Sequence, residues 1–291
     1  MSIPSSSRSE RRASGQTAGS KPSRAGRNLP IAFAVGLSLG AVVIASLIFR
    51  KEIFVGVVVV AVSIGVWELR EGLAQGKINV PLVPSLVGAV TMITATFAGG
   101  GQALTVCFGL TCVSVLLWRM ADGLQDAVRD IAGGIFVTAY VPLLASFASL
   151  MLAAPDGAKR LFVFLLVTIS SDIGGYAVGV MLGKHPMAPS VSPKKSWEGA
   201  AGSALACVTV GVVTVMLIMG GRWWVGVVLG LAVVVSATIG DLTESTIKRD
   251  LGIKDMGKIL PGHGGFMDRL DSLLFSAPVA WALLLVFVPI A

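Results

Sequence analysis

Long apolar stretches alternate with short polar segments along this 291-residue chain from about residue 29 onward. Each stretch holds about 16–23 residues, the length that an α-helix needs to cross a ~30 Å hydrocarbon core. The pattern predicts nine membrane spans with short loops, at residues 29–49, 53–69, 80–97, 103–118, 131–153, 161–183, 199–220, 223–240 and 273–291. Gly99, Gly100 and Gly101 separate the third span from the fourth and fit either a tight hairpin or a longer loop. We therefore expect an all-α polytopic membrane protein.

The first 28 residues differ from the rest of the chain. They are rich in Ser, Gly and Arg, with Glu10 as their only acid, so we expect a disordered basic tail on the cytoplasmic side. The apolar run that follows is too long for a signal-peptide core and is not followed by a small-residue cleavage site. We expect residues 29–291 to form one integral membrane domain, with its motif-bearing core at 161–291. An organelle transit peptide is a weaker alternative, because the tail lacks an amphipathic pattern.

The composition agrees with a membrane protein and narrows the metal chemistry. Only 13% of the residues are charged and 54% are hydrophobic, whereas about a quarter are charged in soluble domains. The three cysteines lie inside apolar runs without metal-type spacing, and there are only two histidines, His185 and His263. A zinc site is therefore not expected, and any metal should have oxygen ligands, which suits Mg²⁺.

Basic residues are distributed unequally between the two sides of the predicted membrane domain. Of 23 Lys and Arg residues, only Arg50, Lys51, Lys159, Arg160 and Arg222 fall in loops after odd-numbered spans. The positive-inside rule then orients the amino terminus and the even-numbered loops toward the cytoplasm, in the cell (inner) membrane. The net charge of +7 is thus explained by basic residues concentrated on one side of the membrane, and no nucleic-acid partner is expected.

The stretch between Ser245 and Asp271 concentrates charge, glycine and a histidine as no other stretch does. Its basic residues are suited to phosphate: Lys248, Arg249, Lys254, Lys258 and Arg269. Its acids are suited to a divalent metal: Asp255, Asp268 and Asp271. Glycines at 262, 264 and 265 would let the backbone approach a ligand closely. The stretch therefore predicts a phosphate-handling site on the cytoplasmic face.

A polar stripe leads from the eighth span into that stretch. Asp241, Glu244, Ser245 and Lys248 follow i, i+3, i+4, i+7 spacing and so share one face of a helix. Glu68 is another acid inside a predicted span. Acids at such depth are costly unless they face protein or water.

A second polar cluster covers residues 172–199. Asp172 lies inside a span, while Gly175, Gly179 and Gly183 form a small-residue face for close helix packing, so Asp172 and Tyr176 should point into the bundle. After it, Ser192, Lys194 and Lys195 precede a helix amino terminus and together suit a polyphosphate. A purely structural alternative has Ser196 capping the helix and Glu198 complementing its positive end.

These residues carry a resemblance to a known family. Ser245-x-x-Lys248-Arg249-x₄-Lys254-Asp255, followed by Pro261-Gly-His-Gly-Gly265-x-x-Asp268-Arg269-x-Asp271, resembles the signature of the phosphatidate cytidylyltransferases (CDP-diacylglycerol synthases). Asp172-x-Gly-x-Tyr176 and Ala188-Pro-Ser-Val-Ser-Pro-Lys-Lys-Ser-Trp-Glu-Gly199 resemble the family's other cytoplasmic block. Gly175 and Val180 depart from it, since the family usually has Ala and a basic residue there. The second departure removes one potential phosphate contact.

The resemblance implies transfer of a cytidylyl group from CTP to phosphatidic acid among membrane lipids, with Mg²⁺ and potentially a second cation. It implies that Asp241 and Asp268 hold the metal. The residues that it implies for catalysis are Asp241, Asp268, Lys248, Arg249 and His263. Those that it implies for substrate binding are Asp172, Tyr176, Ser192, Lys194, Lys195, Ser245, Lys254, Asp255, Gly264, Gly265, Arg269 and Asp271.

Two other functions remain open on the sequence alone. A CTP-dependent kinase acting on a polyprenol- or phytol-type alcohol would use a related nucleotide site. An ion-coupled transporter would account for Asp172 and Asp241 as intramembrane charges, but the acids gather at one face and no inverted repeat is evident.

The glycine-rich helix faces would suit a homodimer as well as packing within one bundle.

Overall fold

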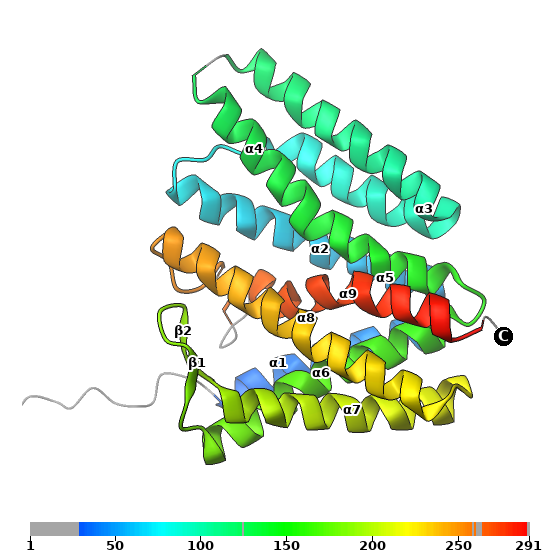
Figure 1. The fold of residues 1–291 in the computed structure, drawn as a ribbon. Helices are drawn as coiled ribbons and strands as arrows, with labels where there is room; N and C mark the ends of the chain where they lie inside the picture. Colours follow the sequence, from blue (N-terminus) through cyan, green and yellow to red (C-terminus); the bar gives the residue numbers. More distant parts are fainter. Residues whose placement is uncertain (1–28, 124, 258, 260–263, 290–291) are drawn as a thin grey trace, which may run out of the picture.

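The computed structural model describes residues 29–123, 125–257, 259 and 264–289, with side chains described from residue 36 (Figure 1). The predicted tail at residues 1–28 and the predicted catalytic residue His263 lie outside these ranges. The described chain is almost entirely helical and has one short two-stranded sheet.

The helices follow the predicted spans closely. In order, the elements are α1 (Leu29–Phe49), α2 (Lys51–Gln75), α3 (Leu82–Ala121), α4 (Ala127–Thr138), the π-helix η1 (Ala139–Leu143), α5 (Leu144–Ala153), α6 (Gly157–Leu182), β1 (Pro186–Ala188), β2 (Ser192–Ser196), α7 (Trp197–Met219), α8 (Trp223–Asp250) and α9 (Met267–Phe287). Among the described residues, seven helices are long and apolar enough to cross a membrane, with α4 to α5 taken as one. The prediction of an all-α polytopic membrane protein is confirmed, whereas the number nine stays a prediction.

Helix α3 contains the predicted third and fourth spans as two arms. Gly100 separates them with φ 66° and ψ −155°, a left-handed conformation that glycine adopts without strain. Gly88 and Thr111 lie against each other across the arms, because a Cβ at Gly88 would be 2.2 Å from Thr111 Cγ2. The arms are therefore antiparallel, and the tight hairpin is the correct alternative for this connection.

Helices α6, α7 and α8 pack against one another through glycine (Figure 1). A Cβ at Gly174 would lie 2.6 Å from Gly202 O, and one at Gly226 would lie 2.4 Å from Val212 Cα. The predicted small-residue face is found at this contact, since Gly175 meets Ser203 on α7. Helices in lipid gain little from hydrophobic burial, so close backbone approach supplies much of their packing energy.

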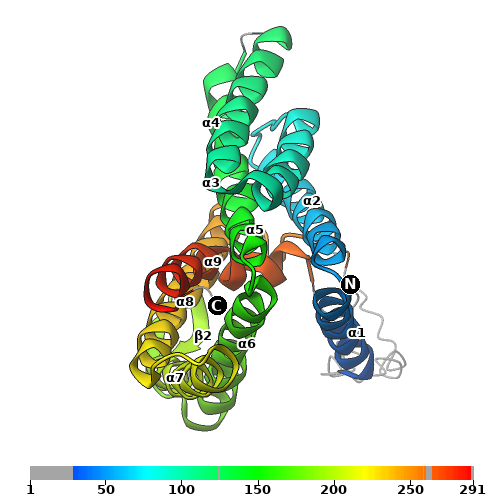
Figure 2. The same cartoon turned by 90° about the vertical axis from the view of Figure 1, so that its right-hand side faces the viewer.

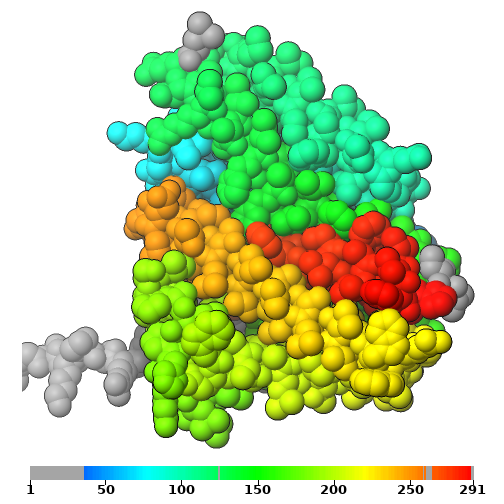
Figure 3. Space-filling view, in the orientation of Figure 1, coloured from blue at the N-terminus to red at the C-terminus, as the bar shows by residue number. Residues whose placement is uncertain are grey.

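Helix α9 lies between the two halves of the molecule, with α5 on one side and α8 on the other (Figure 3). Arg160, which is buried near the start of α6, donates to Leu284 O at 2.7 Å and to Val288 O at 2.9 Å. Its Nε also pairs with Asp156 at 2.7 Å. The guanidinium thus binds carbonyl groups in the last turn of α9 and just beyond its end, where a basic side chain also complements the helix dipole.

Replacing Gly226 by Ala should lower the melting temperature of the detergent-purified protein, because the added methyl would meet α7 backbone that cannot rotate away. Gly56→Ala is the matched control, since a Cβ there meets nothing within 4 Å. That variant should melt at the wild-type temperature or slightly above it, as Ala favours helix over Gly by about 1 kcal/mol. Thermal unfolding followed by circular dichroism measures both. A Gly226→Ala protein as stable as wild type would contradict the close α7–α8 contact.

Candidate active site

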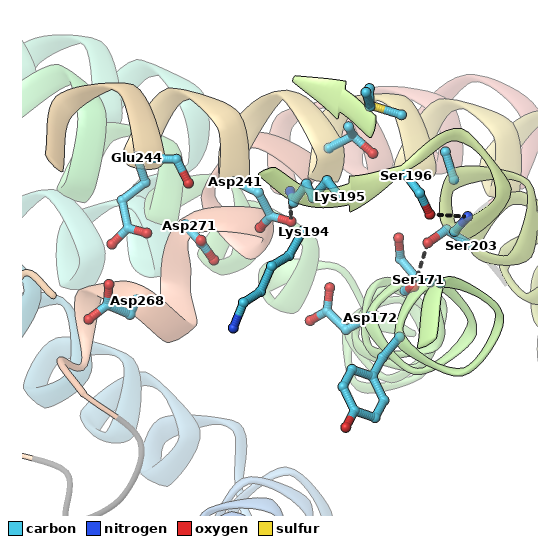
Figure 4. A pocket seen from close by; sticks show the side chains of 18 of the residues that line it. Ser171, Asp172, Lys194, Lys195, Ser196, Ser203, Asp241, Glu244, Asp268 and Asp271 are labelled. Atoms are coloured by element: carbon cyan, nitrogen blue, oxygen red, sulfur yellow. Dashed lines mark hydrogen bonds and ion pairs between the residues drawn. The ribbon is translucent and has the colours of Figure 1, made fainter. Parts of the chain in front are cut away.

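A cavity of about 520 Å³ opens where α6 and α8 end and where α7 and α9 begin (Figure 4). Its size is typical of small-molecule sites. Eleven of the predicted site residues line it: Asp172, Tyr176, Lys194, Lys195, Asp241, Ser245, Lys248, Asp255, Asp268, Arg269 and Asp271. The fold therefore brings both polar clusters of the sequence to one cavity.

Lys248 lines the cavity and connects α8 to α9. Its Nζ lies 2.7 Å from Glu244 Oε2, one helical turn earlier, and 2.6 Å from Asp268 Oδ1 on α9. The side chains of Glu244 and Asp268 are 1% and 10% exposed, so both carboxylates depend on this ammonium for charge compensation. The polar stripe of α8 thus faces the cavity, as its spacing predicts.

The segment that carries the predicted lysines is a β-hairpin. β1 and β2 pair antiparallel, and Glu198 Oε2 accepts hydrogen bonds from the amides of Lys184 and His185 at the base of the hairpin. Ser196 caps α7, because its Oγ accepts from Gly199 N at 3.1 Å. The structural alternative for Ser196 is therefore confirmed. The same arrangement holds the two lysines of β2 over the cavity.

The two lysines of β2 differ in their partners. Lys195 forms an ion pair with Asp241 on α8. Lys194 extends into the cavity toward the space between Asp172 and Asp268 (Figure 4), and no ion pair of Lys194 is found among the described residues. Lys194 is thus the lysine whose charge is most directly available to a ligand.

Asp268 is held by the backbone of the segment before it. Its Oδ2 accepts from Gly265 N at 2.8 Å and from Met256 N at 3.3 Å. Gly264 has φ 84°, and a Cβ there would lie 3.2 Å from the same oxygen. Gly264 and Gly265 therefore let the chain wrap around the carboxylate of Asp268.

Several predicted residues lie elsewhere. Arg249 does not line the cavity, and its Nε donates to Val191 O at 3.3 Å in the hairpin turn. Ser192 is half-buried in β2, and Lys254 is exposed outside the cavity lining. Tyr176 is 75% exposed on the cavity wall, so the expectation that it points into the packed bundle is wrong. The glycines of α6 make the contact with α7 instead.

Glu244 is a cavity residue that the sequence interpretation did not include among the site residues. It belongs to the stripe with Asp241 and Lys248, and that spacing was the available signal. Its Oε1 is buried without a hydrogen-bond partner among the described residues. An unsatisfied buried carboxylate oxygen is a candidate metal ligand.

The cavity lining tests the prediction of a metal. Six acids and four basic residues line it, and their carboxylates are the hard oxygen donors that Mg²⁺ prefers. Within the described ranges, no three acid, histidine or cysteine side chains converge as a ready ligand shell. Lysines pair with Asp241 and Asp268 at present. The donor set therefore fits Mg²⁺ in its chemistry, with the two predicted ligands in the same cavity.

Several known proteins are similar in sequence to this chain. The model of the cytidylyltransferase family matches residues 31–287. A protein named phosphatidate cytidylyltransferase from Mycobacterium leprae is 42% identical over 277 residues, which cover 90% of this chain and 89% of that protein. Its namesake from Mycobacterium bovis is 40% identical over 284 residues, covering 92% of each. One from Brucella melitensis is 36% identical over 184 residues, covering 62% of this chain and 65% of that protein.

The sequence comparisons and the geometry of the cavity agree. Signature residues from both blocks, among them Asp172, Lys195 and Asp268, line the cavity, and the family match extends from α1 to α9. The chain belongs to the cytidylyltransferase family.

Proposed function

We propose that this protein is a phosphatidate cytidylyltransferase, which converts CTP and phosphatidic acid to CDP-diacylglycerol and pyrophosphate for phospholipid synthesis. The observation that carries the proposal is the cavity at the helix ends, where acids and lysines from β2, α6, α8 and α9 face one space. The names of the relatives, which are similar over nearly the whole chain, support the choice of substrates.

In this reaction a phosphate oxygen of phosphatidic acid bonds to the α-phosphorus of CTP, and the bond between the α- and β-phosphates breaks. The nucleophile is already ionised, so the main requirements are in-line positioning and charge compensation. Lys194, Lys195, Lys248 and Arg269 supply positive charge around the cavity. Lys194 is the cation that we expect to meet a phosphate first, since no acid pairs with it in the described residues.

The charge balance of the cavity also calls for a cation. With six acids and four basic residues, the lining is formally negative, and a bound triphosphate would add further negative charge. Asp241 and Asp268 would hold Mg²⁺. Glu244 lies one turn after Asp241 on the α8 stripe and shares Lys248 with Asp268. Bound Mg²⁺ would offset charge on the phosphate oxygens, and a second cation would fit the need to stabilise both attacking and leaving oxygens.

The lipid substrate needs an apolar path to the cavity. Tyr176 on the cavity wall is followed along α6 by Val180, which is 68% exposed, and preceded by Ile173, which is 65% exposed. An apolar helix face next to a charged cavity suits a molecule that has a phosphate head and acyl tails. We assign this face of α6 to the diacylglycerol part of the substrate.

We further propose that the protein lies in the cell membrane with its amino terminus and the cavity on the cytoplasmic side, where CTP is available. The sided distribution of basic residues supports this orientation. In a cysteine-free background made by replacing Cys107, Cys112 and Cys207, Arg222→Cys should react with an impermeant maleimide on intact cells. Asp122→Cys, at the opposite helix ends, should react only after permeabilisation. The reverse labelling pattern would overturn the orientation.

The activity itself has a direct test. Purified protein in detergent with CTP, phosphatidic acid and Mg²⁺ should form CDP-diacylglycerol and pyrophosphate in equal amounts, which chromatography and a coupled pyrophosphate assay measure. Asp268→Asn should abolish turnover while the protein stays folded, because the variant keeps the side-chain volume but loses the charge. Formation of CDP with a phosphorylated lipid would instead indicate the kinase alternative, and full activity of Asp268→Asn would refute the metal assignment.

Lys194→Ala should raise the KM for CTP by about tenfold or more and leave the melting temperature unchanged. A hydrogen bond to a charged group contributes about 1.5–3 kcal/mol, and each 1.4 kcal/mol is a factor of ten. Lys248→Ala is the informative contrast. It should reduce both activity and stability, because the loss of one partner from a buried ion pair costs about 3–5 kcal/mol. An unchanged KM in Lys194→Ala would show that its ammonium does not contact the nucleotide.

A further inference from the structure

Helix α2 lies against the start of α9 and the segment that leads into it (Figure 2). A Cβ at Gly65 would lie 3.2 Å from Leu270 Cδ1, and one at Gly72 would lie 3.2 Å from Met256 Sδ. Gly65, Glu68 and Gly72 share one face of α2, since they are separated by three and four residues. This face of the amino-terminal half therefore supports the segment that holds Asp268.

Glu68 is the polar group on that face, and it is only 1% exposed. Its Oε2 accepts a hydrogen bond from Met267 N at 2.8 Å. Met267 is the first residue of α9, and its amide is one of those that a helix leaves without an internal partner. A carboxylate at this position also complements the positive end of the helix. Asp268, the proposed metal ligand, is the next residue.

Two glycines bring the backbone around this carboxylate. A Cβ at Gly257 would lie 1.9 Å from Glu68 Oε1. One at Gly265 would lie 2.8 Å from Glu68 Oε2 and 2.9 Å from Asp268 Oδ2. Glu68 and Asp268 thus hold the same short piece of chain at two amides, Glu68 at Met267 N and Asp268 at Gly265 N.

Packing alone does not account for an acid at this position. Glu68 is buried, its Oε1 has no hydrogen-bond partner among the described residues, and the like charge of Asp268 is close by. Burial and like charge both disfavour a carboxylate, so an apolar side chain would serve better for packing alone. What a carboxylate adds is a directed acceptor that fixes the first turn of α9.

We propose that Glu68 is a positioning residue for the transfer reaction: from α2 it fixes the start of α9 so that the carboxylate of Asp268 faces the cavity. The proposal rests on the proposed function for its kinetic consequences. Its structural consequence, order in the first turn of α9, can be measured without turnover.

The test compares Glu68→Ala with Glu68→Gln, which keeps an acceptor oxygen of nearly the same geometry. Glu68→Ala should speed hydrogen–deuterium exchange in peptides that cover residues 264–270. It should also lower kcat by about 10- to 100-fold and raise the Mg²⁺ concentration for half-maximal activity, the range typical of losing a group that orients a metal ligand. KM for CTP should change little. Glu68→Gln should restore most of the exchange protection and most of kcat.

Asp130 supplies the matched control. It is also 1% exposed, and it likewise accepts a backbone hydrogen bond from a distant segment, from Asn79 N at 2.7 Å, but it is not part of the cavity lining. Asp130→Ala breaks a buried ion pair with Arg119, so it should lower the melting temperature and leave kcat and the Mg²⁺ dependence unchanged. If Asp130→Ala gave the same kinetic losses as Glu68→Ala, the role of Glu68 would be general stability, and the proposal would be overturned.

The remaining outcomes are equally decisive. Unchanged exchange at residues 264–270 or an unchanged kcat in Glu68→Ala refutes positioning by Glu68. Should that variant fail to fold, Gly257→Ala replaces it, because its methyl would displace the Glu68 carboxylate. It should reproduce the loss of kcat, and a fully active Gly257→Ala protein would then refute the proposal. A wild-type protein without transferase activity contradicts the proposed function, whereas the exchange experiment still tests the position of α9.

Discussion

The ion pairs of Lys248 are the interaction on which the rest of the site depends. One ammonium compensates Glu244 on its own helix and Asp268 on the next, and both carboxylates are nearly buried. Among membrane helices an uncompensated carboxylate is costly, so the ends of α8 and α9 must stay together. Because Asp268 also accepts the amides of Met256 and Gly265, this constraint extends to the segment between the two helices.

Glycine contacts then determine how far apart the remaining groups lie. Close approach of α6 to α7 and of α7 to α8 brings Asp172, Lys195 and Asp241 to one cavity, although they come from separate segments. The amino-terminal part also contributes, because α2 packs against the start of α9 and the chain before it. The amino-terminal half, which carries no signature residue, thus belongs to the architecture of the site.

The sequence predicted the helical membrane fold and most of the charged cavity residues for one physical reason. In a membrane protein, long apolar stretches mark the helices that cross the bilayer, and charged residues among them are conspicuous because their burial is costly. The β-hairpin was not predicted, since residues 186–196 show no clear strand alternation, and its base depends on contacts with Glu198. The contact of Arg249 with Val191 was not predictable either, because the two residues are 58 positions apart and meet only through the fold. For Glu68 the cost was visible, but its partner Met267 lies 199 residues further along the chain.

Helix α9 is anchored at both ends by opposite charges from other helices, with Glu68 at its first amide and Arg160 at its last carbonyls. It cannot slide along its axis without losing one of these anchors, so it forms a stiff wall of the cavity. The opposite wall is compliant: no residue of β1 or β2 is buried, and a few hydrogen bonds and ion pairs tie the hairpin down. Elements with so little buried surface open at low free-energy cost. We therefore expect the hairpin to move when ligands of different size bind, while α9 with its acids keeps its position.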